Sequence, residues 1–173
     1  MPFTARLIQS SGSPKISNQQ RDRAMTKELR ANRQDFLTAA MAAENRLEYV
    51  TLNDWALLLD KAKYRSFAKG EELIHIGRQE PVVIFLAKGS ARIVSGRRWP
   101  IATVAAGEIL GDMAFMEGTQ SSATVLAETP IEAYLISWSD LRHLFESYPH
   151  LGSRFYRSVA VSLSRRLRRQ ISE

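Results

Sequence analysis

Seven short apolar runs lie between residues 63 and 137, and glycine or proline separates them at about ten-residue spacing. Short runs at this spacing are typical of the strands of an all-β sandwich or barrel, because helices need longer stretches of 3.6-residue periodicity. Residues alternate in character in Ser90–Val94 and Ile131–Ile136, which predicts strands with one solvent-exposed face. We therefore predict a mainly β fold. The runs are KYRSFAKG, EELIHIG, PVVIFLAKG, SARIVSG, PIATVAAG, SSATVLAETP and IEAYLIS.

Helical patterns precede the β region. Residues 18–47 contain no proline or glycine, and their apolar residues recur at three- and four-residue intervals. This pattern predicts an amphipathic helix, either one long helix or two joined near Asn32. A short helix follows over residues 51–62, where Thr51 or Asn53 can cap the first turn.

Two further helices are predicted after the β region. Ser137 or Ser139 can cap the first, and Pro149 ends it. The last helix runs from about His150 to the end of the chain. Its apolar residues recur every four positions, at Leu151, Phe155, Val159, Leu163, Leu167 and Ile171. A four-residue step overshoots a helical turn by about 40°, so the stripe drifts around the helix. We expect its early part to pack on the barrel and its later part to meet a second subunit; alternatively, the helix only wraps its own barrel.

Three segments follow from these patterns. Residues 1–17 hold Gly12, Pro14 and four serines with little periodicity, which predicts a disordered lead-in. Residues 18–62 form an N-terminal helical segment. Residues 63–173 form the β-barrel with its C-terminal helices.

Composition excludes several classes of protein. The chain has no cysteine, so disulfide frameworks, zinc knuckles, thiol catalysis and iron–sulfur clusters are excluded. Of its three histidines, only His75 lies in the strand region, and no Ser-His-Asp order, G-x-S-x-G, Walker loop or H-E-x-x-H motif is present. We therefore expect neither an enzyme nor a metal site. No run approaches 18 apolar residues, so we expect no transmembrane segment. We expect a cytoplasmic location, with a transit peptide at the N-terminus as the alternative.

The formal charge of +6 lies at the two ends of the chain. Residues 1–35 hold seven basic and three acidic residues, and residues 150–173 hold six arginines and one glutamate. The middle, residues 36–149, holds eleven basic and fourteen acidic residues. The basic ends are either solvated helix surfaces or contacts for an anionic partner.

Three motifs carry a resemblance to a known family. F-x-K-G-E-x-L-x-x-x-G spans Phe67–Gly77, V-x-x-G-E-I-L-G-D-M-A-F-M-E-G-T-Q-S-S-A-T-V spans Val104–Val125, and L-S-R-R-L-R-R spans Leu163–Arg169. They resemble the first strands, the phosphate-binding cassette and the hinge-distal helix of the cyclic nucleotide-binding domain. This domain occurs in catabolite-activator proteins, cyclic-nucleotide-gated channels and protein kinase A regulatory subunits. The resemblance implies a double-stranded β-helix (jelly-roll) barrel that regulates through a bound ligand, cAMP or cGMP, with no other cofactor.

The resemblance implies a ligand site in the second motif. Backbone N–H groups at tight glycine turns and at a helix N-terminus suit an anionic phosphate. A carboxylate after Gly111 would hold the ribose 2′-hydroxyl, and an arginine ten residues after that glycine would form a bidentate pair with the phosphate. The candidate ligand-binding residues are Gly111, Asp112, Met113, Ala114, Ser121, Ser122 and Ala123.

Two of these positions depart from the family pattern. Asp112 stands where the family has glutamate, and Ser121 stands where it has arginine. A serine cannot neutralise a phosphate, and charge-assisted hydrogen bonds contribute about 1.5–3 kcal/mol each. Another cation would have to replace the arginine. The candidates in or beside strands are Arg78, Arg92, Arg97 and Arg98, and the alternative for each is an exposed strand-edge charge.

The last helix completes the resemblance. The positions that reach the purine in the bacterial family correspond to Gln170 and Ile171. The residues predicted for a partner or dimer helix are Leu163, Arg166, Leu167 and Gln170. Because the chain ends at Glu173 without a winged helix-turn-helix, we expect no sequence-specific DNA binding.

Two functions remain open. In the first, a small anionic ligand, a cyclic nucleotide or an analogue, binds in the cassette and shifts the C-terminal helix. In the second, the pocket is degenerate and the barrel is a ligand-independent dimerisation or protein-interaction module. Ser121 favours the second, whereas the intact length and glycines of the cassette favour the first. We expect a homodimer or a protein partner in either case.

Overall fold

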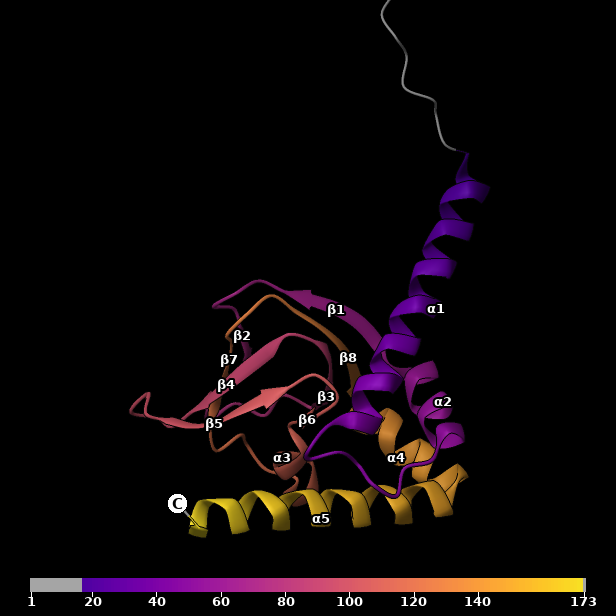
Figure 1. Ribbon diagram of the computed structural model, residues 1–173. Helices are drawn as coiled ribbons and strands as arrows, with labels where there is room; N and C mark the ends of the chain where they lie inside the picture. Colours follow the sequence, from indigo (N-terminus) through magenta and orange to yellow (C-terminus); the bar gives the residue numbers. More distant parts are fainter. Residues whose placement is uncertain (1–16, 173) are drawn as a thin grey trace, which may run out of the picture. The chain divides into compact units, whose positions relative to one another are not determined.

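The computed structural model describes residues 17–172 (Figure 1). The chain divides into two units, residues 1–31 and residues 32–173. The predicted lead-in lies outside the described residues, Ser17 apart. Helix α1 (Asn18–Ala42) begins in the first unit and ends in the second, and it is one helix rather than two.

Two four-stranded antiparallel sheets form the barrel of the second unit. One sheet has the order β1-β8-β3-β6 and the other β2-β7-β4-β5, which is the strand order of a jelly roll. The predicted β-barrel with flanking helices is confirmed. The strands are β1 (Lys63–Phe67), β2 (Glu72–Ile74), β3 (Val82–Lys88), β4 (Ser90–Val94), β5 (Pro100–Ala105), β6 (Ile109–Leu110), β7 (Thr124–Ala127) and β8 (Ile131–Ser137).

Helices cover the outer face of the central strands β3 and β8 of the β1-β8-β3-β6 sheet, so these two strands are largely buried on both faces, whereas β1 is mostly exposed. In β3, Ile84 points into the barrel core while Phe85 belongs to the cluster beneath the helices. The prediction of a solvent-exposed face for Ile131–Ile136 is therefore wrong. Tyr134 of β8 is 2% exposed, and its ring lies 5.5 Å from that of Phe36 in α1.

Two helices begin at capping residues that the sequence predicted. Thr51 caps α2 (Leu52–Lys61) in a capping box with Asp54, and Ser137 caps α4 (Trp138–Ser147). Asp54 is buried and accepts two hydrogen bonds from Arg154 of helix α5 (Pro149–Ser172), at 2.6 and 2.7 Å. These bonds hold the pKa of the Asp54 carboxyl below its ordinary value. The pair thereby ties α2 to the first half of α5.

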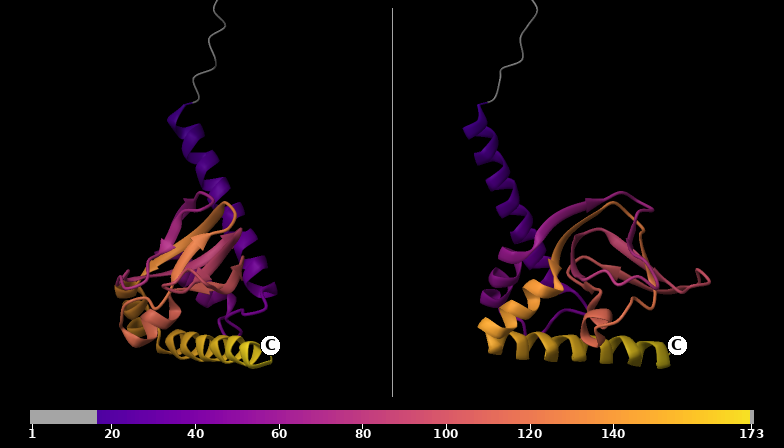
Figure 2. Two further views of the ribbon diagram at one scale, coloured as in Figure 1. Left: turned by 90° about the vertical axis from the view of Figure 1, so that its left-hand side faces the viewer. Right: turned by 180° about the vertical axis from the view of Figure 1, so that it is seen from behind.

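Helix α5 (Pro149–Ser172) runs along one end of the barrel (Figures 1 and 2). Its early apolar residues are buried, as predicted: Leu151, Phe155 and Val159 are each at most 1% exposed. Leu167 and Ile171, near the end of the helix, are 57% and 75% exposed. No helix within residues 17–172 is long and apolar enough to cross a membrane.

Candidate functional site

The cassette motif folds into a tight turn followed by helix α3 (Asp112–Glu117). Gly111 precedes this helix with a φ of 78°, and a Cβ at this position would lie 2.9 Å from the carbonyl oxygen of Val82. Gly107 has a φ of 88°, and a Cβ there would lie 2.2 Å from the carbonyl oxygen of Ala39. Both positions require glycine because the backbone is left-handed and another chain segment lies against it.

A pocket of about 560 Å³ opens beside the cassette, and its volume is within the range of small-molecule sites. Strands β4 and β5 form one wall, the cassette a second and α5 a third. The strand and loop residues are Asn45, Ile93, Ile101, Ala102, Thr103, Val104, Glu108 and Ile109. The remaining lining residues are Met113, Ser122, Ala123, Ser162, Leu163, Arg166, Leu167, Arg169 and Gln170.

The structure brings most of the predicted site residues to this pocket. Three cassette candidates line it, and so do all four residues predicted for a partner or dimer helix. Ala114 instead packs against the hydrophobic core. Ser121 lies outside the lining, and its hydroxyl donates a hydrogen bond to the carbonyl oxygen of Ala123 at 2.8 Å. The position that resembles the family arginine is thus used to close a local turn.

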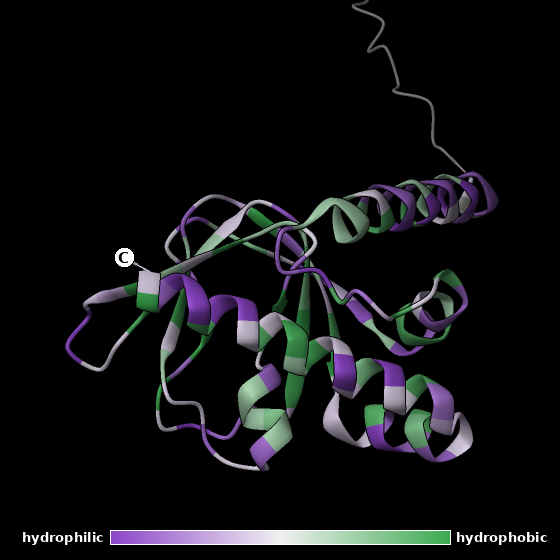
Figure 3. Cartoon of the chain, turned by 60° about the horizontal axis from the view of Figure 1, so that its bottom comes forward, coloured by the Kyte–Doolittle hydropathy of each residue, from purple (hydrophilic) through white to green (hydrophobic). Residues whose placement is uncertain are grey.

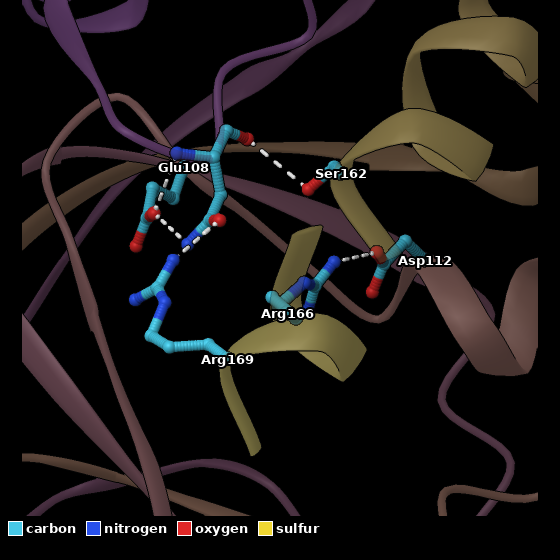
Figure 4. A network of polar contacts seen from close by, with 6 residues as sticks. Glu108, Asp112, Ser162, Arg166 and Arg169 are labelled. Carbon is cyan, nitrogen blue, oxygen red and sulfur yellow. Dashed lines mark hydrogen bonds and ion pairs between the residues drawn. The ribbon is translucent and has the colours of Figure 1, made fainter. Parts of the chain in front are cut away.

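Arg166 supplies a cation to the cassette from α5. Its guanidinium forms an ion pair with the carboxylate of Asp112 (Figure 4). The side chain of Asp112 is 5% exposed and that of Arg166 is 22% exposed. The Nε of Arg166 is buried without a hydrogen-bond partner among the described residues. An unpaired buried donor is unfavourable, so this guanidinium has capacity for another oxygen acceptor.

A second polar network joins the cassette to α5 through Asn45 (Figure 4). The Asn45 amide donates to Glu108 at 2.6 Å, and Glu108 also accepts from the backbone N–H groups of Asn45 and Ala105. On its other side, Asn45 accepts from Arg169 at 2.9 Å and from the hydroxyl of Ser162 at 3.2 Å. Sequence reasoning missed these four side chains. Glu108 lies in the cassette motif, but nothing in the sequence links it to Asn45, 63 residues away.

The cations proposed from sequence do not line the pocket. The lining arginines are Arg166 and Arg169 rather than the four strand-region candidates Arg78, Arg92, Arg97 and Arg98, which are exposed. The reason is that α5 runs along the end of the barrel and places its own Arg166 and Arg169 in the pocket lining. His75 lies beside Glu72, and the described residues hold no group of three or more side chains suited to a metal ion.

Comparison with known proteins defines the family. The model of the cyclic nucleotide-binding domain matches residues 64–148, which run from β1 through the cassette to the end of α4. The chain belongs to this family over that region. A solved cyclic nucleotide-binding domain from Methylobacillus flagellatus superposes with a TM-score of 0.65 at 22% identity, covering 76% of this chain and 81% of that one. This likeness shows the shared fold.

Curated relatives match at low identity. Cyclic GMP-binding protein C of Dictyostelium discoideum is 26% identical over 139 residues, 76% of this chain and 5% of that protein. Glutaminase 2 of Bradyrhizobium diazoefficiens is 32% identical over 117 residues, 65% of this chain and 18% of that protein. The chain spans 5% to 35% of the length of the curated relatives it matches.

Proposed function

We propose that this chain is a regulatory sensor module that binds a small anionic ligand, a cyclic nucleotide or an analogue, in the pocket beside the cassette. The observation that carries the proposal is Arg166, which delivers from α5 the positive charge that Ser121 cannot supply. One relative is named as a cyclic GMP-binding protein, which supports the ligand class. The mostly apolar remainder of the pocket suits a nucleobase.

The ion pair between Arg166 and Asp112 offers a way to exchange partners. A phosphate oxygen that approaches the guanidinium would satisfy its unpaired Nε–H and compete with the Asp112 carboxylate. Asp112, released in part, would accept a hydrogen bond from a ligand hydroxyl. Ligand binding and the position of α5 are linked in this scheme because the exchanging arginine belongs to the helix.

The relay would act through the second half of α5. This half forms the pocket wall, whereas the first half is buried against the core. A ligand that changes the Arg166 and Arg169 contacts therefore changes residues 163–172 with little cost to the packing of residues 149–160. A homodimer or protein partner would read that change in the position of residues 163–172. We propose a non-enzymatic module, because the ionisable side chains that line the pocket, Glu108, Arg166 and Arg169, are each engaged by other residues of the protein. We also propose the cytoplasmic location expected from the sequence.

A second candidate function is supported by the same contacts. The Ser121 hydroxyl is bonded within its own turn, and Asp112, Glu108 and Arg169 have partners without any ligand. Because these polar side chains already have partners within the protein, the pocket is also compatible with a ligand-independent dimerisation or protein-interaction module.

Thermal unfolding with cAMP, cGMP and cyclic di-GMP at millimolar excess separates the two functions. A ligand at about 100-fold its dissociation constant adds about 2.7 kcal/mol, a rise in Tm of roughly 5–11 °C for a chain of this size. The sensor predicts such a rise with one of these ligands. Arg166→Gln should abolish it, and Arg168→Gln is the matched control because Arg168 lies on the same helix outside the pocket lining. No rise with any of the three would favour the interaction module.

A further inference from the structure

The β4–β5 hairpin ends in an unusual turn. The backbone N–H of Ser95 donates to the carbonyl of Trp99 at 2.9 Å, which leaves the three-residue loop Gly96–Arg98. Such loops place their last residue in the left-handed region, where glycine or asparagine is favoured. Here that residue is Arg98, with a φ of 60°, and no other non-glycine residue has a positive φ in the described part of the chain. Glycine would adopt this backbone conformation at a lower cost than arginine does.

Large apolar side chains are exposed beside this turn. Trp99 is 70% exposed, although the other two tryptophans, Trp55 and Trp138, are each 3% exposed. The end of α5 adds Leu167 and Ile171, which are also mostly exposed. The two segments lie on the same side of the barrel (Figures 1 and 3), and strand β5 and the second half of α5 line the same pocket. They therefore form one surface.

The two chain segments that form this surface carry only positive charge. Residues 95–101 and 162–172 contain six arginines and no acidic residue. Three of the arginines, Arg165, Arg166 and Arg169, form ion pairs with carboxylates elsewhere. The other three, Arg97, Arg98 and Arg168, are exposed and pair with no carboxylate within residues 17–172. The excess charge thus faces outward beside the exposed apolar side chains.

We propose that this surface, formed by Arg97, Arg98, Trp99, Leu167, Arg168 and Ile171, docks on an anionic lipid bilayer. Tryptophan is favoured at the membrane–water interface, and arginines are attracted to anionic headgroups. The exposed leucine and isoleucine favour lipid over nucleic acid, which would pair the arginines but leave these side chains in water. A second copy in isologous contact would bring like charges together without an acidic partner. This inference does not depend on the pocket having a ligand.

Trp99 provides the test. We would measure tryptophan fluorescence and sedimentation of the full chain with vesicles of phosphatidylcholine alone and with 30% phosphatidylserine. Trp99 dominates any change on docking, because Trp55 and Trp138 are already buried. We expect a blue shift and co-sedimentation with the anionic vesicles only, both weakened by salt. Trp99→Tyr should lose the blue shift.

The charge variants make the test quantitative. Each arginine near an anionic surface contributes about 1 kcal/mol, or roughly five-fold in partitioning. Arg97→Ser with Arg98→Gly should therefore weaken binding about 25-fold. Glycine adopts the left-handed conformation at position 98 without strain. The double variant should therefore unfold at a temperature equal to or higher than that of the unmodified chain. Arg78→Ser, an exposed arginine outside the surface, is the control and should bind unchanged.

Three results would overturn the proposal. Equal binding to neutral and anionic vesicles would remove the role of charge, and unchanged binding by the Arg97→Ser/Arg98→Gly variant would place the contact elsewhere. Binding of a single-stranded oligonucleotide, or formation of a dimer that buries Trp99, without binding to anionic vesicles would assign the surface to that partner instead.

Discussion

The two halves of helix α5 are held to the barrel by different forces. The first half is packed: Leu151, Phe155 and Val159 are almost fully buried, and Phe155 meets a cluster of rings that includes Phe115 and Phe145. The second half is held by polar contacts, in which Arg165, Arg166 and Arg169 pair with Glu48, Asp112 and Glu44.

This difference indicates which part of the helix can move. Displacing buried rings exposes apolar surface and opens cavities, which costs several kcal/mol. The ion pairs of Arg165 and Arg169 are partly exposed and contribute little to stability. In the more buried pair of Arg166 with Asp112, another anion can replace the carboxylate. The first half is therefore an anchor, and the second half is a displaceable wall of the pocket. The following predictions test this contrast, from the largest expected effect to the smallest.

Phe155→Ala should have the largest effect on stability. Removing this fully buried ring leaves a cavity among Phe115, Phe145 and Tyr156, which should lower the free energy of unfolding by about 3–5 kcal/mol. Leu167→Ala on the same helix is the control and should change it by less than about 0.5 kcal/mol. Denaturant unfolding measures both. If Phe155→Ala and Leu167→Ala lowered the free energy of unfolding by similar amounts, the proposed difference between the two halves of α5 would be contradicted.

Asp54→Asn should have the next largest effect. It removes charge-assisted hydrogen bonds from Arg154 and weakens the cap of α2, so we expect a loss of about 2 kcal/mol at neutral pH. Because the pKa of Asp54 is lowered in the folded protein, its contribution is complete above its ordinary value of 3.8 and is lost as the pH falls through the folded-state value.

The pH dependence gives the control for this variant. The difference in stability between the natural chain and Asp54→Asn should be constant above about pH 5 and should narrow below pH 4. Thermal unfolding from pH 7 to pH 3 measures this difference. A gap that widens on acidification would show that the Asp54 carboxylate does not stabilise the fold.

Arg165→Gln should have the smallest effect. Its ion pair with Glu48 is about one-third exposed on both sides, so we expect a loss below about 1 kcal/mol, smaller still in high salt. Thermal unfolding at low and high ionic strength measures this loss of stability. Arg168→Gln is the control, because Arg168 forms no ion pair within residues 17–172. A loss of several kcal/mol would make the second half of α5 as firmly anchored as the first.

The sequence predicted what depends on local chemistry. Turn glycines and short apolar runs located seven of the eight strands, and Thr51 and Ser137 were among the predicted caps. The strand β6 was missed because it has only two residues and lies within the cassette motif.

What the sequence could not predict depends on contacts between distant residues. The alternation in β8 suggested an exposed face, but Phe36 covers Tyr134 from nearly 100 positions earlier. The cation beside the cassette comes from Arg166, 54 residues after Asp112, and no local pattern distinguishes it from the neighbouring arginines. Asn45 has no motif at all, and only the fold shows that it joins Glu108 to α5.

Amide hydrogen exchange along α5, with and without millimolar cAMP, cGMP or cyclic di-GMP, tests the central claim most directly. Without ligand, residues 163–172 should exchange much faster than residues 151–160, because polar contacts hold them, apart from Leu163, which packs against the core. A bound ligand should slow exchange in residues 163–172 and 111–123 and leave residues 151–160 unchanged. Exchange of the whole helix as one unit, unaffected by all three ligands, would contradict a displaceable pocket wall.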